Sequence, residues 1–160
     1  HVVVFGYHRM GWHILKMLRK LKKEVLIVDF NPEVIERLRN KGVAAVFGDA
    51  TDPELLETVH LKNAEMIIST IPYRQENLML VESIRRAHKD ILTITTASEI
   101  DDALELYQKG ADYVILPQML GGEYIAELLE KYQSGTLRRF LTGRKQEARL
   151  TRTRNHSLYY

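Results

Sequence analysis

One segment near the amino terminus constrains the fold more than any other, because it joins an apolar run to a glycine turn. Residues 2–5 are Val-Val-Val-Phe, and Gly6 and Gly11 follow them. A continuous apolar run of this length predicts a strand that is buried on both faces. The glycines indicate a tight turn into a helix, as in the dinucleotide fingerprint G-x-G-x-x-G. His8 stands where that fingerprint has its middle glycine.

The same alternation of strand and helix continues along the chain. Apolar runs predict strands at Val2–Phe5, Val25–Val28, Ala44–Phe47, Met66–Thr70, Ile91–Thr95 and Tyr113–Leu116. Helical spacing and capping residues predict helices at Ile14–Leu21, Asn31–Gly42, a short stretch from Asp52, Gln75–His88, Ser98–Gly110 and Gly122–Tyr132. We therefore expect an α/β chain, a Rossmann-like doubly wound parallel six-stranded sheet of order 3-2-1-4-5-6, over residues 1–132.

Composition narrows the classes of function. The 160 residues are 45% hydrophobic and 28% charged, with no cysteine. The chain therefore has no disulfide framework and no thiolate metal site, and the spacing of its histidines gives no reason to expect a metal. Residues 133–160 form a basic tail or crossover segment, which we expect to be solvated, with anionic lipid or nucleic acid as the alternative contact. Because the chain begins inside an apparent strand without a methionine, we expect it to be part of a longer polypeptide.

The first turn and the second strand carry residues that are expected to bind phosphate and ribose. The alternative for the glycine turn is a purely structural joint, because many strand-turn-helix joints use glycine. Gly6 permits the sharp turn, Gly11 permits close packing of the helix, and Arg9 is placed to contact a phosphate at the helix start. Asp29 ends the second strand and is expected to accept hydrogen bonds from both ribose hydroxyls, which favours NAD over NADP. The alternative for Asp29 is a helix cap or loop acid.

Two further strand ends complete the predicted crevice. Asp49 follows the third strand, where it either accepts from an adenine amino group or only begins the next turn. Thr70 and Ile71 follow the fourth strand and are expected to face the second half of a dinucleotide. His8 either contacts the phosphate or crowds the diphosphate, so that a shorter nucleotide is preferred.

Several segments together resemble one family, the RCK/KTN (TrkA-N) domains, and most of all those of Kef-like monovalent cation:proton antiporters. The matching segments are residues 6–11, 28–32, 47–51, 68–72, 76–77 and 110–117. The resemblance implies that NAD(H), or AMP, ADP or ATP, binds in the crevice, and that the domain pairs as a homodimer. It places the binding residues at Gly6, Tyr7, His8, Arg9, Met10, Gly11, Asp29, Phe30, Asn31, Asp49, Ala50, Thr70 and Ile71.

Two functions follow from these features. The first is a nucleotide-sensing regulatory domain of a potassium or sodium transporter or channel. It would lie at the cytoplasmic face of the membrane, have its membrane domain on the same polypeptide, and bind no nucleic acid. The alternative is an NAD-dependent oxidoreductase. We expect no enzyme activity, because no lysine follows Tyr107, Tyr113 or Tyr124 at the spacing of short-chain dehydrogenases. Near the end of the chain an apolar face repeats at helical spacing, made of Tyr124, Ile125, Leu128 and Leu129. The resemblance implies that this face lies between subunits, and the alternative is that it packs on the sheet of its own chain.

Overall fold

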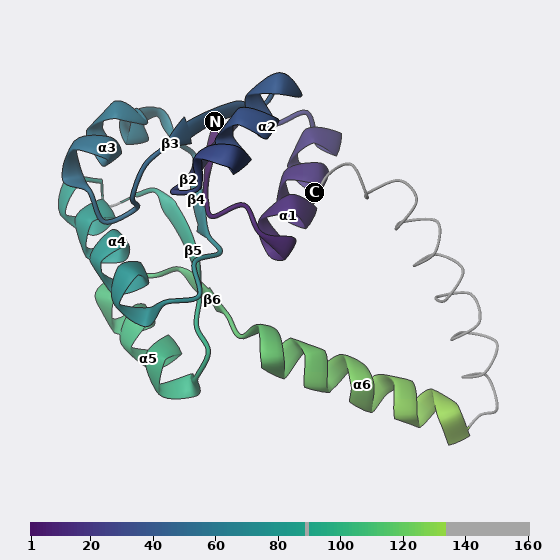
Figure 1. Ribbon diagram of the computed structural model, residues 1–160. Coiled ribbons are helices and arrows are strands. Elements are labelled where there is room, and N and C mark those ends of the chain that lie inside the picture. The colour runs from purple at the N-terminus through teal and green to yellow at the C-terminus, as the bar shows by residue number, and fades with distance from the viewer. Residues whose placement is uncertain (89, 134–160) are drawn as a thin grey trace. The chain divides into compact units, whose positions relative to one another are not determined.

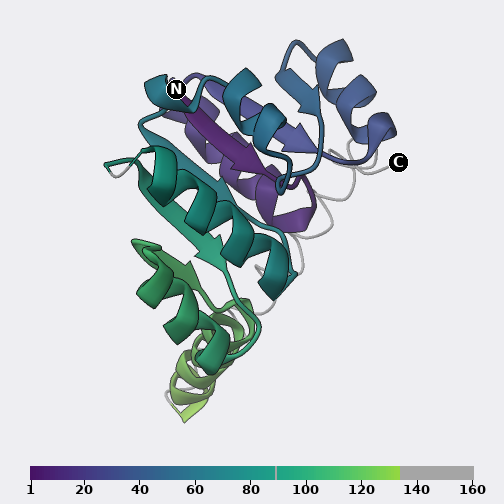
Figure 2. The same cartoon turned by 90° about the vertical axis from the view of Figure 1, so that its left-hand side faces the viewer.

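The protein is represented by a computed structural model, which describes residues 1–88 and 90–133. Its centre is a six-stranded parallel sheet of order β3-β2-β1-β4-β5-β6 (Figures 1 and 2), which confirms the predicted fold class and strand order. The strands are β1 (Val2–Phe5), β2 (Val25–Asp29), β3 (Ala44–Phe47), β4 (Met66–Ser69), β5 (Leu92–Thr96) and β6 (Tyr113–Ile115).

Helices cover both faces of this sheet, as Figure 1 shows. On one face lie α1 (Arg9–Lys20) and α2 (Pro32–Asn40), and on the other lie α3 (Pro53–Thr58), α4 (Arg74–Ala87) and α5 (Ile100–Lys109). A short 3-10 helix, η1 (Leu61–Asn63), precedes β4 and was not expected from the sequence. Helices on both faces explain why the central strand β1 is continuously apolar.

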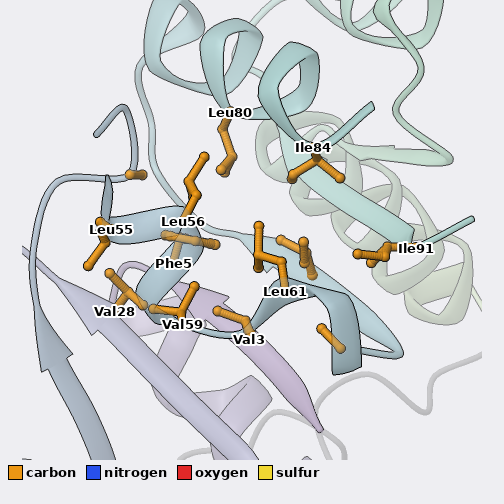
Figure 3. Packing of buried hydrophobic residues seen from close by; sticks show 13 residues of the cluster. Val3, Phe5, Val28, Leu55, Leu56, Val59, Leu61, Leu80, Ile84 and Ile91 are labelled. Carbon is orange, nitrogen blue, oxygen red and sulfur yellow. The ribbon is translucent and has the colours of Figure 1, made fainter. Parts of the chain in front are cut away.

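The alternation of side chains along β1 divides the core into two layers. Val2 and Val4 pack with α1 and α2, whereas Val3 and Phe5 pack with α3, η1 and α4. Figure 3 shows the second layer, in which Phe5 and Val3 lie among leucine and isoleucine side chains of the covering helices. All four side chains of β1 are at most 1% exposed, so the strand that leads into the glycine turn is the most protected part of the sheet.

Helix ends follow the predicted capping residues at most positions. Asn31 and Asp52 each accept a hydrogen bond from the backbone N–H two residues on, at 2.9 Å, and a proline opens each helix. Gly110 ends α5 in the left-handed conformation. The prediction that Ser98 caps α5 is wrong, because the helix begins at Ile100 with Glu99 at the cap position and no side-chain cap.

The chain divides into two compact units, His1–Pro117 and Gln118–Tyr160. The last helix, α6 (Pro117–Gln133), begins earlier than the predicted start at Gly122. Proline is favoured in the first turn of a helix, and two internal glycines weaken a helix without ending it. The predicted basic tail, residues 133–160, lies outside the described residues apart from Gln133, and the domain boundary at residue 132 stays a prediction. Within the described residues, no helix has the length and apolar character needed to cross a bilayer.

Candidate functional site

A cavity of about 290 Å³ opens where the neighbouring strands β3, β2, β1 and β4 end. This is the edge at which the direction of winding reverses, where open α/β sheets bind ligands. The cavity is lined by Phe5, Gly6, His8, Val28, Asp29, Phe30, Gly48, Asp49, Ala50, Ile71, Pro72, Tyr73 and Glu76. The predicted residues that line it are Gly6, His8, Asp29, Phe30, Asp49, Ala50 and Ile71.

The glycine turn brings β1 and α1 unusually close together. Gly6 has a φ of +84°, a left-handed conformation that favours glycine. A Cβ placed on Gly11 would lie 2.4 Å from the carbonyl oxygen of Gly6. The Thr70 hydroxyl donates to the same oxygen, at 3.0 Å, and so ties the β4 end to the turn. Gly11 and Thr70 therefore fix the position of the Gly6 carbonyl in the turn and do not line the cavity.

Asp29 joins the turns that follow β1 and β2. Asp29 is 3% exposed, and its carboxylate accepts from the Tyr7 N–H at 2.6 Å and from the Asn31 N–H at 2.9 Å. The predicted ribose acid is thus also a structural tie between the two rims. The Asn31 side chain caps α2 instead, by accepting a hydrogen bond from the Glu33 N–H.

The first turn of α1 remains open to an anion. His8 occupies the cap position, is exposed at the cavity, and makes no side-chain cap hydrogen bond. Backbone N–H groups at such an end carry a partial positive charge and bind phosphate well. Arg9 and Met10 begin the helix but do not line the cavity.

The rim after β3 carries a second carboxylate. Asp49 lines the cavity and accepts from the Thr51 N–H and the Thr51 hydroxyl, both at 2.8 Å. Asp49 therefore begins the next turn, as one of the two predicted roles requires. It also lines the cavity, where the other role, contact with an adenine amino group, would place it. The residue before Asp49 is Gly48. A Cβ at that position would lie 2.6 Å from the Leu55 side chain, so the close packing of Leu55 favours glycine there.

The rim after β4 is held by a buried polar network around Asn77. Asn77 is fully buried, and its amide donates to the carbonyl oxygens of Ile71 at 2.8 Å and Thr96 at 2.9 Å. Ser69 donates to the Asn77 side-chain oxygen at 2.6 Å. A fully satisfied network of this kind fixes backbone positions. It therefore fixes Ile71, which lines the cavity, relative to the end of β5.

Tyr73 and Glu76 also line the cavity, although the sequence did not predict them as site residues. They lie beyond Pro72, at the start of α4, rather than at a strand end. Pro72 keeps the backbone of this rim extended, and it was the sequence feature that could have indicated Tyr73 and Glu76 as site residues. Burial and the neighbouring Asp49 carboxylate raise the pKa of Glu76 above its usual value of 4.5.

We expect Glu76→Gln to stabilise the domain at neutral pH. An acid whose pKa is raised by folding is harder to ionise in the folded state, so its contribution to stability is lost as pH rises through the folded pKa. The free energy of unfolding of Glu76→Gln should equal that of the wild type below about pH 4.5. It should exceed the wild-type value increasingly as pH rises through the raised pKa of Glu76. Urea unfolding across this range measures it, with Glu57→Gln, an exposed glutamate on α3, as the control. A gain that is the same at every pH would contradict the prediction.

The chain is similar to one domain family and to parts of two Escherichia coli transport proteins. A family model described as the TrkA-N domain matches residues 2–117. YbaL of Escherichia coli strain K12, named as a candidate cation/proton antiporter, is 29% identical over 135 residues, which cover 84% of this chain and 24% of that protein. The glutathione-regulated potassium-efflux system protein KefC of Escherichia coli O139:H28 is 31% identical over 111 residues, 69% of this chain and 18% of KefC. The chain thus spans about a quarter or less of these relatives.

Solved structures share the fold. The TrkA-N domain of the inner membrane protein YbaL from Escherichia coli aligns with a TM-score of 0.78 and 29% identity, over 81% of this chain and 96% of that one. The GsuK channel bound to NAD has a TM-score of 0.66 and 22% identity, over 73% of this chain and 21% of that one. The Kef CTD of Shewanella denitrificans in AMP-bound form has a TM-score of 0.72 and 19% identity, over 99% of both chains. The last two likenesses establish the shared fold.

Proposed function

This chain belongs to the TrkA-N domain family, and from that premise we propose that it is the nucleotide-sensing regulatory domain of a monovalent-cation transporter or channel. One observation carries the proposal: the turn that leads into α1 and the buried Asp29 carboxylate face the same cavity. The first group suits a phosphate and the second suits a ribose, so the cavity suits a nucleotide.

The ligand we propose is NAD(H) or an adenine nucleotide: AMP, ADP or ATP. Its phosphate would lie at the first turn of α1, its ribose on Asp29, and its adenine beside Asp49 and Ala50. Phe30, which is exposed at the same rim, offers an aromatic face to the base. A dinucleotide would continue toward Ile71, whereas a mononucleotide would leave that rim empty.

His8 sets the choice between these ligands. Glycine at this position lets the backbone approach a diphosphate, and a side chain takes up part of that space. An imidazole at the amino end of α1 also offers a phosphate one more hydrogen-bond donor. We therefore propose that His8 favours a ligand whose phosphate sits slightly away from the backbone.

The role proposed for the domain is binding rather than catalysis. A regulatory domain needs a ligand that binds one conformation better than another, and it needs no proton donor beside the ligand. The relatives YbaL and KefC are transport proteins by name, which supports this role. The alternative, an NAD-dependent oxidoreductase, requires a substrate pocket and a proton donor in addition.

The partners follow from the same reasoning. Because the chain spans 24% of YbaL and 18% of KefC, we propose that a membrane transporter domain belongs to the same full-length polypeptide. The domain itself would then lie at the cytoplasmic face of the membrane. We also propose a homodimer, supported by the exposed apolar side chains Tyr124, Ile125 and Leu129 on α6.

Native mass spectrometry of the purified chain tests nucleotide and dimer together. We expect a dimer that carries an adenine nucleotide, and titration calorimetry of the stripped protein should rank NADH, NAD, AMP, ADP and ATP. A monomer that binds none of these five would contradict the proposal. Steady oxidation or reduction of added NAD(H) with a panel of alcohols and carbonyl compounds would instead support the oxidoreductase.

A further inference from the structure

The outward side of α1 carries basic side chains and no acidic one. Lys16, Arg19 and Lys20 are exposed on this helix, and the exposed Lys22 lies two residues beyond its end. We call these four side chains the basic face. The helix contains no acidic residue, and Glu24 is the first acid after it. Positive charge is therefore concentrated on a single surface element.

None of the four cations of the basic face pairs with a carboxylate within residues 1–88 and 90–133. The Lys16 ammonium lies 5.2 Å from the centre of the Trp12 ring, a contact that keeps its charge. Several cations on other elements are paired, since Arg74 pairs with Asp102, and Lys109 with Glu82. The charge of the basic face is thus left for a partner to neutralise.

Two apolar side chains accompany the basic face. Met17 is 53% exposed and Leu21 is 61% exposed, and they lie one helical turn apart, as Lys16 and Lys20 do. Exposed apolar side chains flanked by lysines are typical of helices that lie in the interface of a membrane. The lysines meet the headgroups while the apolar side chains enter the region below them.

We propose that the basic face, with Met17 and Leu21, is a docking surface for the anionic lipid headgroups of a membrane. Clusters of four to eight Lys or Arg on a helix bind acidic lipids through charge complementarity. Single-stranded nucleic acid is less well matched, because single strands are bound through exposed aromatic side chains and this surface offers methionine and leucine. A duplex binds lysines through its phosphates and would leave Met17 and Leu21 without an apolar partner. The inference is independent of the nucleotide cavity, which lies at the carboxyl ends of the strands.

Vesicle co-sedimentation of the full 160-residue chain tests the proposal. We expect binding to phosphatidylcholine vesicles that contain phosphatidylglycerol, weakening as salt is added, and no binding to phosphatidylcholine alone. Lys20→Gln should weaken binding about 5-fold and Lys16→Gln/Lys20→Gln about 30-fold. Met17→Ser/Leu21→Ser should weaken it by about tenfold.

The control is Arg86→Gln, which removes one exposed helical cation outside the basic face and should leave binding unchanged. Thermal unfolding of each variant checks that a loss of vesicle binding does not come from unfolding of the protein. Equal binding by all variants would overturn the proposal and assign the lipid contact to the basic residues of 133–160. Tighter binding of a DNA duplex at the same salt, with the same loss in the Lys16→Gln/Lys20→Gln variant, would overturn it in favour of nucleic acid.

Discussion

Gly11→Ala is expected to lower the free energy of unfolding by about 3 kcal/mol, the upper end of the usual cost of overpacking. The new methyl group would lie 2.4 Å from the Gly6 carbonyl oxygen, which is backbone and cannot rotate away. Relief of this contact requires α1 to move away from β1, where Leu15 and Leu18 hold it on the sheet. For a domain of this size the loss corresponds to a fall in Tm of about 10 °C.

The effect of Gly11→Ala is diagnostic because alanine in a helix is normally the better residue. At an exposed helical position the same change stabilises by about 1 kcal/mol. Gly42→Ala is the matched control, since a Cβ there meets no atom of the described chain within 4 Å and only the positive φ of +67° opposes it. That cost is about 1 kcal/mol. A Gly11→Ala protein as stable as wild type in thermal unfolding would show that β1 and α1 are not packed this closely.

Asp29→Ala is expected to weaken nucleotide binding about 100-fold, which is the loss of one or two hydrogen bonds to a charged acceptor. The same change should cost about 3 kcal/mol of stability, because the Tyr7 and Asn31 N–H groups lose their acceptor in a buried place. The two losses have separate readouts, calorimetric titration with the nucleotide and urea unfolding without it.

Asp29→Asn separates the two roles of this residue. Asparagine keeps the size and one acceptor oxygen, so more of the fold should survive while the ribose contact is weakened. Asp52→Ala is the control for a lost hydrogen bond to a backbone N–H, since Asp52 caps α3 and does not line the cavity. It should cost about 1 kcal/mol of stability and leave affinity unchanged. Wild-type affinity in Asp29→Asn would contradict the ribose assignment.

The fold was predictable because its signals are local and agree with one another. The central strand β1 is a short apolar run that is buried on both faces, and turn or capping residues such as Asn31, Asp52 and Gly110 separate the elements of the chain. Helix ends were less predictable, as at Ser98 and Gly122. A cap depends on the conformation of one residue, and the sequence offers several polar residues near each end.

The candidate site was predictable as far as strand ends define it. Asp29 ends β2 and Asp49 lies two residues after β3, and parallel strands bring their carboxyl ends to one edge. Side-chain direction was not predictable in the same way, so Arg9 and Thr70 were expected at a cavity that they do not line. Tyr73 and Glu76 reach it from the next helix, a placement that depends on how α4 packs. The predicted contacts of these residues with a nucleotide stay predictions.

The hydrogen bond from the Thr70 hydroxyl to the Gly6 carbonyl oxygen links residues 64 positions apart, and this separation has a consequence for folding. Closing so long a loop costs entropy before any contact is gained, so the two rims of the cavity meet late as the chain folds. During synthesis the first rim leaves the ribosome well before β4 does, and it stays without its second wall until β4 docks beside β1. A nucleotide bound as proposed would therefore stabilise only molecules in which both halves of the sheet have formed. Occupancy of the cavity would then mark a chain whose folding is complete.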